Sequence, residues 1–309
     1  MSSLQSWRDL NIDEVNEKVN QICPLQSDLT DSEKIIFSVL RDAIKEKGLP
    51  IQLRIAGGWV RDKLLNIQSK DLDFTTDKLT GVEFANIILD FLKRNNRLDL
   101  AGRISVIKAN PEKSKHLETA HMRLCGIDVD FVGLRKETYK QDSRCPIIEV
   151  GEAAEDALRR DLTINALFYN VTQKIVEDLT GKGLIDLKNR VARTPIDPIQ
   201  TLTDDPLRAL RVIRFSCRLS LAIDPQLSEG LKIDEIHKRI LTLISRERIG
   251  EEMIGIFLRS GDDMHRMHAV DGLRLIAAHK LNDVIFPLGQ EKWNEQEISI
   301  GICIADAPE

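Results

Sequence analysis

The chain has 309 residues, of which 42% are hydrophobic and 30% are charged, so it is expected to form soluble globular domains. Its net charge of −5 argues against a protein that is basic overall, although a basic groove can lie on an acidic chain. The five cysteines form no C-x-x-C pair, which argues against a disulfide framework and a zinc site. No apolar run reaches the roughly 20 residues of a membrane span, and the first residues lack the features of a secretory signal or a transit peptide.

The amino-terminal part is predicted to open with helix and then to alternate strands with helices. Residues 1–50 favour helix and include an amphipathic segment, Ser32–Lys47. Further on, alternating apolar residues predict strands, and apolar residues three or four apart predict helices. The expected strands are Ile51–Ala56, Asp71–Thr75, Ile104–Lys108, Glu118–Leu124 and Ile127–Leu134, and the expected helices are Trp59–Asn66 and Gly81–Arg94. Cys125-Gly126 is expected to form a tight turn, and the polar segment Asn110–His116 a mobile loop.

Beyond about residue 185 the strand signals fade and helical spacing takes over. Three further helices are expected, at Thr203–Leu219, Ser228–Leu243 and Arg246–Arg259. This order of elements predicts an α+β fold, with an α/β region followed by an all-α region. His265 and His268 stand three apart, but no further ligand has a useful spacing, so a structural role is preferred over a metal site.

The first chemical motif combines a glycine turn, Gly57-Gly58, with two alternating carboxylates, Asp71 and Asp73. Two aspartates one residue apart on a strand point to the same face, and a divalent cation such as Mg²⁺ relieves their repulsion. Glycines before a helix let backbone N–H groups approach phosphates. A D-x-D pair alone is usually a solvated surface feature, but together with the glycines and Arg61 it predicts nucleotidyl transfer.

Asp130 is a candidate third catalytic carboxylate. It alternates with Asp128 on an expected strand, so both side chains face the same way. A solvated edge strand is the alternative interpretation of this pattern.

A second cluster places Arg159, Arg160 and Asp161 shortly before Asn165. An aspartate can orient an arginine, and an oriented guanidinium grips phosphate or ribose oxygens in a fork. The alternative is an ordinary salt bridge at the end of an amphipathic helix.

A third cluster begins with Asp204, Asp205 and Pro206, which favour the first turn of a helix. The arginines that follow recur every three or four residues and share one helix face: Arg208, Arg211, Arg214 and Arg218. An aspartate beside an arginine offers an acceptor and several donors, which can pair with the edge of a base. A solvated charged face is the alternative.

These motifs together resemble the class II tRNA nucleotidyltransferases, or CCA-adding enzymes, and their poly(A) polymerase relatives. Five motifs stand in the family's order between about residues 51 and 285. They are the G-G-x-V-R-D…D-x-D metal motif, the nucleotide motif Arg159–Ala166, the connector Asp178–Leu187, the base-selecting Asp205–Arg208 and the late motif Ser245–Glu252. The segments most similar to the eukaryotic branch are Lys115–Ala120, Asp128–Arg135 and Asp142–Pro146.

The resemblance implies a head, neck, body and tail, with a polymerase-β-like sheet in the head. It implies that Asp71 and Asp73 bind Mg²⁺. Other residues of the head would hold the phosphates and sugar of the nucleotide: Gly57, Gly58, Arg61, Arg160, Asp161 and Asn165. Four residues of the neck would select ATP or CTP through the base edge: Asp205, Arg208, Arg211 and Arg214. No nucleic-acid template would be required.

We therefore expect a helical extension at 1–50, a nucleotidyltransferase head at 51–185, a neck at 186–245 and a partial body at 246–309. The expected activity is addition of C, C and A to tRNA 3′ ends from CTP and ATP with Mg²⁺. In two places the chain departs from the family. Asp204 stands where a glutamate is usual, and the segment after residue 288 no longer resembles it, as if the body were truncated.

The alternatives are a CC-adding, A-adding or poly(A)-synthesising relative, and a truncated RNA-binding protein without activity. The expected partners are the 3′ end of tRNA and the substrates ATP and CTP, with no membrane and no obligate protein partner. The expected location is the cytoplasm, with mitochondria or the nucleus as additional locations.

Overall fold

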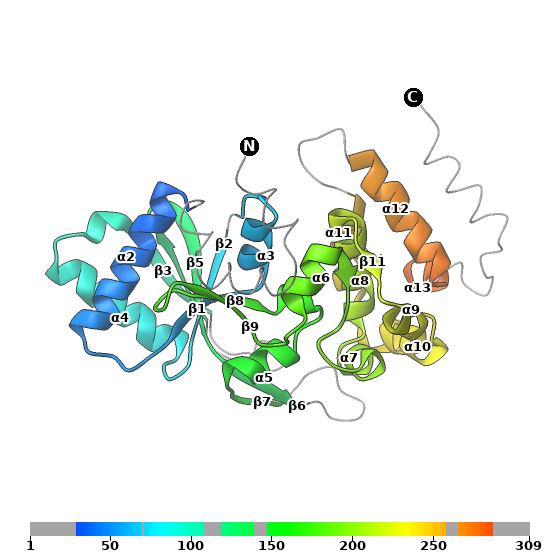
Figure 1. Cartoon of the computed structure of the whole chain (residues 1–309), viewed down its shortest axis with the longest axis horizontal. Coiled ribbons are helices and arrows are strands. Elements are labelled where there is room, and N and C mark those ends of the chain that lie inside the picture. The colour runs from blue at the N-terminus through cyan, green and yellow to red at the C-terminus, as the bar shows by residue number, and fades with distance from the viewer. Residues whose placement is uncertain (1–28, 70, 108–118, 139–146, 258–264, 287–309) are drawn as a thin grey trace. The chain divides into compact units, whose positions relative to one another are not determined.

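The structure, a computed structural model, describes residues 29–69, 71–107, 119–138, 147–257 and 265–286. Within these residues the chain divides into two compact units, the first ending at Lys188 and the second beginning at Asn189 (Figure 1). The loop expected at Asn110–His116 lies outside the described residues. In the part of the chain that is described, no helix is long and apolar enough to cross a membrane. The boundaries of extension, head, neck and body stay predictions.

The first unit is built on a seven-stranded mixed sheet. In spatial order its strands are β3 (Ala101–Ile107), β4 (Thr119–Leu124), β5 (Ile127–Gly133), β2 (Asp71–Thr76), β1 (Leu53–Ala56), β8 (Leu167–Asn170) and β9 (Ile175–Asp178). Neighbouring strands run antiparallel, except that β2 and β5 run parallel. The α+β fold class is thus confirmed, and each of the five expected strands is present with ends shifted by three residues at most.

Strands β8 and β9 were not predicted. All four residues of β8 are buried, so the alternation that marks a half-exposed strand is absent from its sequence. The unit also contains a separate two-stranded sheet of β6 (Arg135–Thr138) and β7 (Ile147–Val150). Its short helices are α3 (Gly58–Leu64), α5 (Ala153–Leu158) and α6 (Gly183–Asn189). Two 3-10 turns lie at Leu98–Leu100 and Thr163–Asn165.

Two longer helices, α2 (Asp31–Glu46) and α4 (Gly81–Arg94), begin where the sequence carries a capping signal. In each, a threonine and a glutamate three residues later accept each other's backbone N–H: Thr30 with Glu33, and Thr80 with Glu83. These contacts satisfy two of the N–H groups that a helix start leaves unpaired. Both helices therefore form where the local pattern predicts them.

The core of the first unit lies between these helices and one face of the sheet. Phe37 of α2 packs against Trp59, Phe74 and Tyr169, with ring centroids 5.7, 6.0 and 5.9 Å away. Phe84 of α4 packs edge-on against Phe131 of β5 at 5.2 Å. Because side chains alternate along a strand, the residues between these aromatic ones point to the other face of the sheet.

The start of α4 lies so close to β5 that only glycine fits at position 81. A Cβ atom on Gly81 would overlap the backbone carbonyl of Phe131. We expect Gly81→Ala to lower the free energy of unfolding, measured with urea, by about 1–3 kcal/mol or more, because the backbone must shift. The control is Gly250→Ala in helix α11 (Arg246–Phe257), where nothing lies within 4 Å of the new methyl group. That change should raise stability by up to about 1 kcal/mol, and a neutral Gly81→Ala would contradict the argument.

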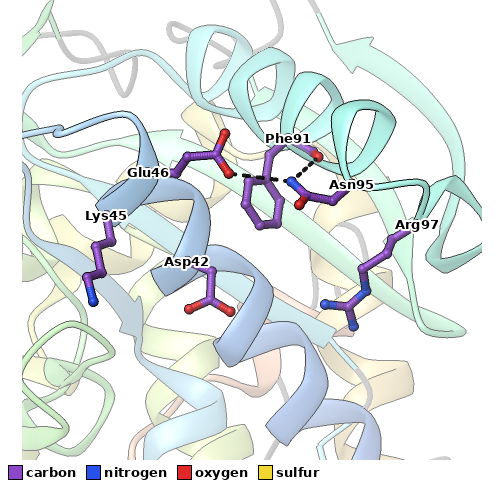
Figure 2. A pocket seen from close by; sticks show the side chains of 6 residues that line it. All are labelled: Asp42, Lys45, Glu46, Phe91, Asn95 and Arg97. Atoms are coloured by element: carbon purple, nitrogen blue, oxygen red, sulfur yellow. Dashed lines mark hydrogen bonds between the residues drawn. The ribbon is translucent and has the colours of Figure 1, made fainter.

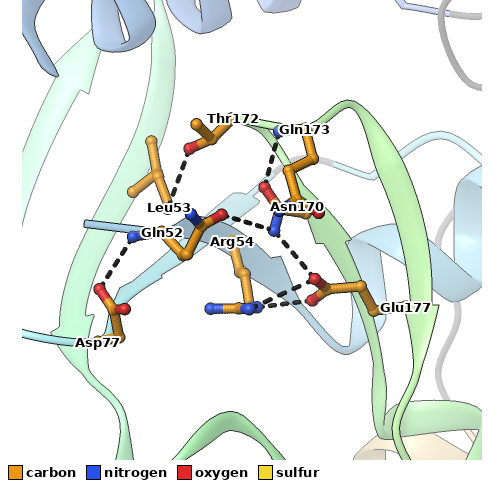
Figure 3. A network of polar contacts seen from close by, with 8 residues as sticks. All are labelled: Gln52, Leu53, Arg54, Asp77, Asn170, Thr172, Gln173 and Glu177. Atoms are coloured by element: carbon orange, nitrogen blue, oxygen red, sulfur yellow. Dashed lines mark hydrogen bonds and ion pairs between the residues drawn. The ribbon is translucent and has the colours of Figure 1, made fainter. Parts of the chain in front are cut away.

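On the other face of the sheet a polar network ties β1 to β9 (Figure 3). Arg54 Nε donates to Glu177 Oε2 at 2.6 Å, and Arg54 NH2 donates to Glu177 Oε1 at 3.3 Å. Asn170 Nδ2 donates to Glu177 Oε1 at 2.9 Å and to Gln52 Oε1 at 3.1 Å. Both partners of the ion pair have side chains only 14% exposed, so this pair links the strands with little screening by solvent.

The second unit is helical. Its elements are α7 (Pro198–Asp204), α8 (Leu207–Leu219), α9 (Pro225–Leu231), α10 (Asp234–Leu243), α11, α12 (His265–Ala278), α13 (Asn282–Ile285) and a two-residue parallel pair of β10 (Val191–Ala192) and β11 (Ala222–Ile223). Helix α8 packs against both α11 and α12. The expected helix at Arg246–Arg259 is present as α11, and its last two residues lie outside the described residues.

Two of the expected helices are each broken in two. The helix expected at Thr203–Leu219 is wrong at its start, because Asp205 is extended (φ −137°, ψ 99°) between α7 and α8. Asp205 precedes Pro206, whose ring disfavours the helical conformation of the residue before it. The helix expected at Ser228–Leu243 is also interrupted, since α9 ends at Leu231 and Ile233 is extended before α10.

Candidate active site

Four carboxylates from two neighbouring strands share the sheet face that α2 and α4 leave uncovered. The parallel register of β2 and β5 aligns Asp71 with Asp128 and Asp73 with Asp130. On β2 the intervening Leu72 is 1% exposed and packs into the core, while Asp71 and Asp73 are exposed. The predicted common face of Asp71 and Asp73 is therefore present, and Asp130 lies next to Asp73.

The negative charges of the aspartates at this face repel one another. Although Asp73 is exposed in part, nearby protein atoms reduce the hydration of its carboxyl and raise its pKa. The negative charges of Asp130 and Asp71 raise it further, and Arg160 acts in the opposite direction. A divalent cation held by Asp71 and Asp73 would relieve this repulsion, so the pair fits Mg²⁺, which prefers oxygen ligands. Among the described residues no group of three His, Cys, Asp or Glu side chains is arranged to hold a metal ion. Asp130 as a third metal ligand stays a prediction.

Asp130 has a partner that the sequence did not indicate. His121 of β4 is its cross-strand neighbour, and His121 Nδ1 lies 2.7 Å from Asp130 Oδ1. The imidazole is thus close enough to donate a hydrogen bond to the carboxylate. Only the pairing of β4 with β5 brings these two residues together.

The glycine turn lies beside the carboxylates because β1 pairs with β2. Ile55 is opposite Phe74, so β1 ends next to Asp73 and continues directly into Gly57 and α3. Gly57 has a φ of +70°, a conformation that favours glycine, and its N–H donates to Leu167 O at 2.9 Å. A Cβ atom on Gly57 would lie 2.7 Å from Arg160 NH1. The missing side chain therefore leaves room for the guanidinium of Arg160.

Three of the other predicted residues form one hydrogen-bonded chain. Arg61 NH1 donates to Asn165 Oδ1, and Asn165 Nδ2 donates to Asp161 Oδ1 at 3.0 Å. The same Asp161 oxygen accepts from the backbone N–H of Leu162 at 2.8 Å. All three residues are buried, at 8%, 6% and 5% exposure for Arg61, Asn165 and Asp161. Asp161 thus orients an arginine indirectly, through Asn165.

The carboxylate that directly holds Arg159 and Arg160 is Asp156 of α5, which the sequence analysis missed. Asp156 Oδ2 accepts from Arg160 NH2 at 2.8 Å and from Arg160 Nε at 3.1 Å. Asp156 Oδ1 accepts from Arg159 Nε at 2.9 Å. The spacing of three and four residues within one helical turn was the signal that could have identified this partner.

The base-selecting candidates lie in the second unit, at the start of α8 and along it. Asp205 Oδ1 accepts from Leu207 N at 3.2 Å, and Arg208 N donates to Asp205 O at 3.0 Å. The Arg208 side chain is 6% exposed and donates through NH1 to Thr201 O at 3.3 Å. Asp205 and Arg208 are therefore neighbours, as the motif predicted.

Arg211 and Arg214 are held by a glutamate from another helix. Arg214 Nε donates to Glu252 Oε2 at 2.6 Å, and Arg211 NH1 lies 3.9 Å from Glu252 Oε1. The Arg214 guanidinium also stacks at 4.4 Å from the Phe215 ring centre. Glu252 belongs to the late motif on α11, and no local spacing links it to the arginines of α8.

A cavity of about 490 Å³ lies elsewhere on the first unit, between the carboxyl-terminal ends of α2 and α4 (Figure 2). It is lined by Asp42, Lys45, Glu46, Phe91, Asn95 and Arg97. Asn95 Nδ2 donates across it to Glu46 Oε2 at 3.4 Å and to Phe91 O at 2.9 Å. Its charges are mixed, and it lies on the helical side of the sheet, so it is not part of the site formed by Asp71 and Asp73.

The chain matches one protein family and several known proteins. The family described as the Poly A polymerase head domain matches residues 53–193. The mitochondrial CCA tRNA nucleotidyltransferase of Saccharomyces cerevisiae is 44% identical over 272 residues, covering 87% of this chain and 47% of that protein. The tRNA nucleotidyltransferase cca1 of Schizosaccharomyces pombe is 45% identical over 230 residues, covering 73% of this chain and 46% of that protein. The chain thus spans about half the length of these relatives.

One solved structure is similar to the chain in both fold and sequence. It is a tRNA nucleotidyltransferase complexed with a primer tRNA and an incoming ATP analog, with a TM-score of 0.63 and 26% identity. The match covers 84% of this chain and 65% of that chain.

Proposed function

The chain belongs to the tRNA nucleotidyltransferase and poly(A) polymerase family through its Poly A polymerase head domain at residues 53–193, and from this premise we propose that it adds C, C and A to the 3′ end of tRNA. It would transfer CMP and AMP from CTP and ATP without a nucleic-acid template. The observation that carries the proposal is the placement of Asp71 and Asp73 on one open sheet face, next to the glycine turn and Arg160.

In this proposal Asp71 and Asp73 hold Mg²⁺. Mg²⁺ bound there would supply the positive charge that activates the terminal tRNA hydroxyl and neutralises the triphosphate. The 3′ oxygen then forms a bond to the α-phosphorus, the bond to pyrophosphate breaks, and the hydroxyl proton passes to solvent. The backbone at Gly57-Gly58 and the guanidiniums of Arg61 and Arg160 bind phosphate and ribose oxygens, with Asn165 and Asp161 orienting Arg61.

The direct test is incorporation of labelled CTP and ATP, offered separately, into tRNA that lacks CCA and into tRNA that ends in CC. We expect CMP incorporation on the first substrate and AMP incorporation on the second. No incorporation of either nucleotide at adequate protein concentration would refute the proposal. Product length on a denaturing gel separates full CCA addition from CC addition, A addition and poly(A) synthesis. Affinity for tRNA without incorporation would support an inactive RNA-binding protein instead.

Base selection by Asp205 and Arg208 makes a separate prediction. We expect Asp205→Ala to reduce the discrimination between CTP and ATP about tenfold or more, since a good pair of contacts to a base edge contributes about 1–3 kcal/mol. Metal binding should be unchanged, because Asp205 is not one of the carboxylates proposed to hold Mg²⁺. Asp204→Ala, at the neighbouring carboxylate, is the control and should keep discrimination. Full discrimination by Asp205→Ala would show that another residue reads the base.

We propose that this activity resides in the cytoplasm, with mitochondria or the nucleus as additional locations. Two curated relatives are named as mitochondrial. We expect no obligate protein partner.

A further inference from the structure

One buried carboxylate holds two adjacent arginines in the first unit. Asp156 is 1% exposed, and the side chains of Arg159 and Arg160 are 17% and 19% exposed. Each oxygen of the carboxylate serves a different arginine, Oδ1 accepting from Arg159 and Oδ2 from Arg160. A buried carboxylate is costly unless it is paired, so this arrangement fixes all three side chains together.

The guanidinium of Arg160 is fixed by further contacts. Its NH1 donates to Asn165 O at 3.2 Å, and its Cζ lies 5.2 Å from the ring centre of Phe168. On another side it fills the space where Gly57 has no side chain. The guanidinium thus lies over the Phe168 ring, while its hydrogen bonds to Asn165 O and Asp156 fix its orientation. The position of Arg160 is therefore determined by the folded protein before any nucleotide arrives.

The contacts among the described residues use three of the five N–H groups of Arg160. Asp156 accepts from Nε and NH2, and Asn165 O accepts from NH1. One hydrogen on NH1 and one on NH2 therefore remain for a ligand, and a guanidinium with two adjacent donors suits a pair of oxygen acceptors. Phosphate oxygens and the two ribose hydroxyls both have this chemistry.

The cluster of Asp156, Arg159 and Arg160 is positive overall. Burial would raise the pKa of Asp156, but Arg160 and Arg159 outweigh that effect and lower it, so Asp156 remains an anion beside them. The cluster of one carboxylate and two guanidiniums carries one net positive charge beside Gly57, where an anionic nucleotide would lie in the proposed reaction.

We propose that Asp156 is the positioning residue of nucleotide binding, since its carboxylate holds the Arg160 guanidinium so that two N–H groups face the oxygens of the incoming CTP or ATP. This inference rests on the proposed function. Asp156 itself need not touch the nucleotide; it acts through Arg160. Preorganisation of this kind strengthens binding because the cost of ordering the arginine is met during folding.

The test measures equilibrium binding of labelled CTP and ATP to the full chain in the absence of tRNA. Asp156→Asn keeps the size of the side chain but leaves one acceptor oxygen for two arginines. We expect the Kd of both nucleotides to rise roughly tenfold, the effect of weakening one charge-assisted contact. In steady-state assays KM should rise while kcat changes little, because the contact is made in the ground state as well as the transition state.

The matched control is Glu177→Gln in the same unit. Glu177 accepts hydrogen bonds from Nε and NH2 of Arg54, as Asp156 does from Arg160, and the change weakens this pair (Figure 3). It should lower stability without changing the Kd of either nucleotide. Combining Asp156→Asn with Arg160→Ala should give the Kd of Arg160→Ala alone, since both changes remove the same contact. A wild-type Kd in Asp156→Asn, or fully additive losses in the double variant, would overturn the inference.

If Asp156→Asn does not fold, Arg160→Lys provides the second variant. A lysine keeps the charge but cannot serve Asp156 and a pair of ligand oxygens at once, so the same roughly tenfold loss is expected. Wild-type affinity in Arg160→Lys would equally overturn the inference. A chain that binds CTP and ATP through Arg160 but adds nothing to tRNA would overturn the proposed function and leave this inference standing.

Discussion

Asp73→Asn is expected to abolish nucleotide incorporation while leaving the folded protein at least as stable as the wild type. Asp73 lies between Asp71 on its own strand and Asp130 on the next. In the proposed reaction it is a metal ligand, and loss of the metal's charge stabilisation removes several kcal/mol from the transition state. Because each 1.4 kcal/mol is about a factor of ten in rate, incorporation should fall on the order of a thousandfold or more.

Stability is not expected to fall together with activity in Asp73→Asn. The pKa of Asp73 is raised, by reduced hydration of its carboxyl and then by the negative charges of Asp130 and Asp71, so at neutral pH its negative charge opposes folding. The neutral asparagine removes that opposition, and the melting temperature should stay the same or rise. Most substitutions that inactivate an enzyme by disturbing its fold lower the melting temperature. Loss of incorporation with an unchanged or higher melting temperature therefore distinguishes loss of chemistry from loss of fold.

Labelled CTP incorporation and thermal unfolding, each with and without Mg²⁺, provide the measurement. Mg²⁺ with CTP should raise the melting temperature of the wild type, since a ligand that binds the folded state stabilises it, and should fail to do so in Asp73→Asn. Asp90→Asn, on the exposed side of α4, is the control and should behave as wild type. Incorporation by Asp73→Asn within tenfold of wild type would exclude this residue from the metal site.

Among the substitutions proposed for this chain, Glu33→Ala is expected to lower the free energy of unfolding the most. Glu33 is 3% exposed at the start of α2, and it accepts from the Trp59 indole N–H at 2.8 Å, from Lys63 Nζ at 2.7 Å and from Thr30 N at 2.7 Å. Lys63 is itself only 8% exposed. Removing Glu33 breaks its ion pair with this buried ammonium, and breaking a buried ion pair costs about 3–5 kcal/mol.

The same contacts predict how stability depends on pH. Burial alone would raise the pKa of Glu33, but the hydrogen bonds from Lys63, Trp59 and Thr30 outweigh burial and lower it below its ordinary value of 4.5. The stabilisation from ionised Glu33 is therefore fully present above about pH 4.5 and is lost as the pH falls through the lower pKa of the folded state. Glu33→Gln should flatten the pH dependence of stability in this acid range.

Urea unfolding, followed by tryptophan fluorescence and circular dichroism between pH 3 and pH 7, provides the measurement. Glu83→Ala is the matched control, because Glu83 occupies the same capping-box position on α4 but is exposed. It should cost on the order of 1 kcal/mol, the contribution of one helix-capping feature. Equal losses in Glu33→Ala and Glu83→Ala would mean that the buried pair adds nothing beyond the cap.

Features that depend on neighbours in the chain could be predicted from the amino-acid pattern. Helix α4 has the predicted bounds, because its capping threonine and glutamate and its apolar spacing lie within one short segment. The common face of Asp71 and Asp73 follows from strand periodicity in the same way. The two broken helices show the limit of that reasoning. Helical spacing continued across Asp205, while the restriction imposed by Pro206 decided the conformation.

The partners of the charged residues were decided by folding. Asp130 stands beside Asp73 only because β5 pairs in parallel with β2, and His121 reaches Asp130 only because β4 pairs with β5. Glu252 meets Arg214 across two packed helices, and Glu33 meets Lys63 between α2 and α3. Such contacts join residues far apart in the chain, and their geometry depends on how whole elements pack, which no local spacing encodes.

The opening motif illustrates the division between these two sources. Residue types and spacing alone established that this chain carries two aligned carboxylates, a glycine turn and an arginine pair, and so indicated nucleotidyl transfer. The tertiary structure decided that these parts meet where β1 ends beside β2, and that Gly57 leaves the space which Arg160 fills. The reason is physical: a side chain's type sets what it can bind, whereas its position depends on the packing and pairing of the elements that carry it.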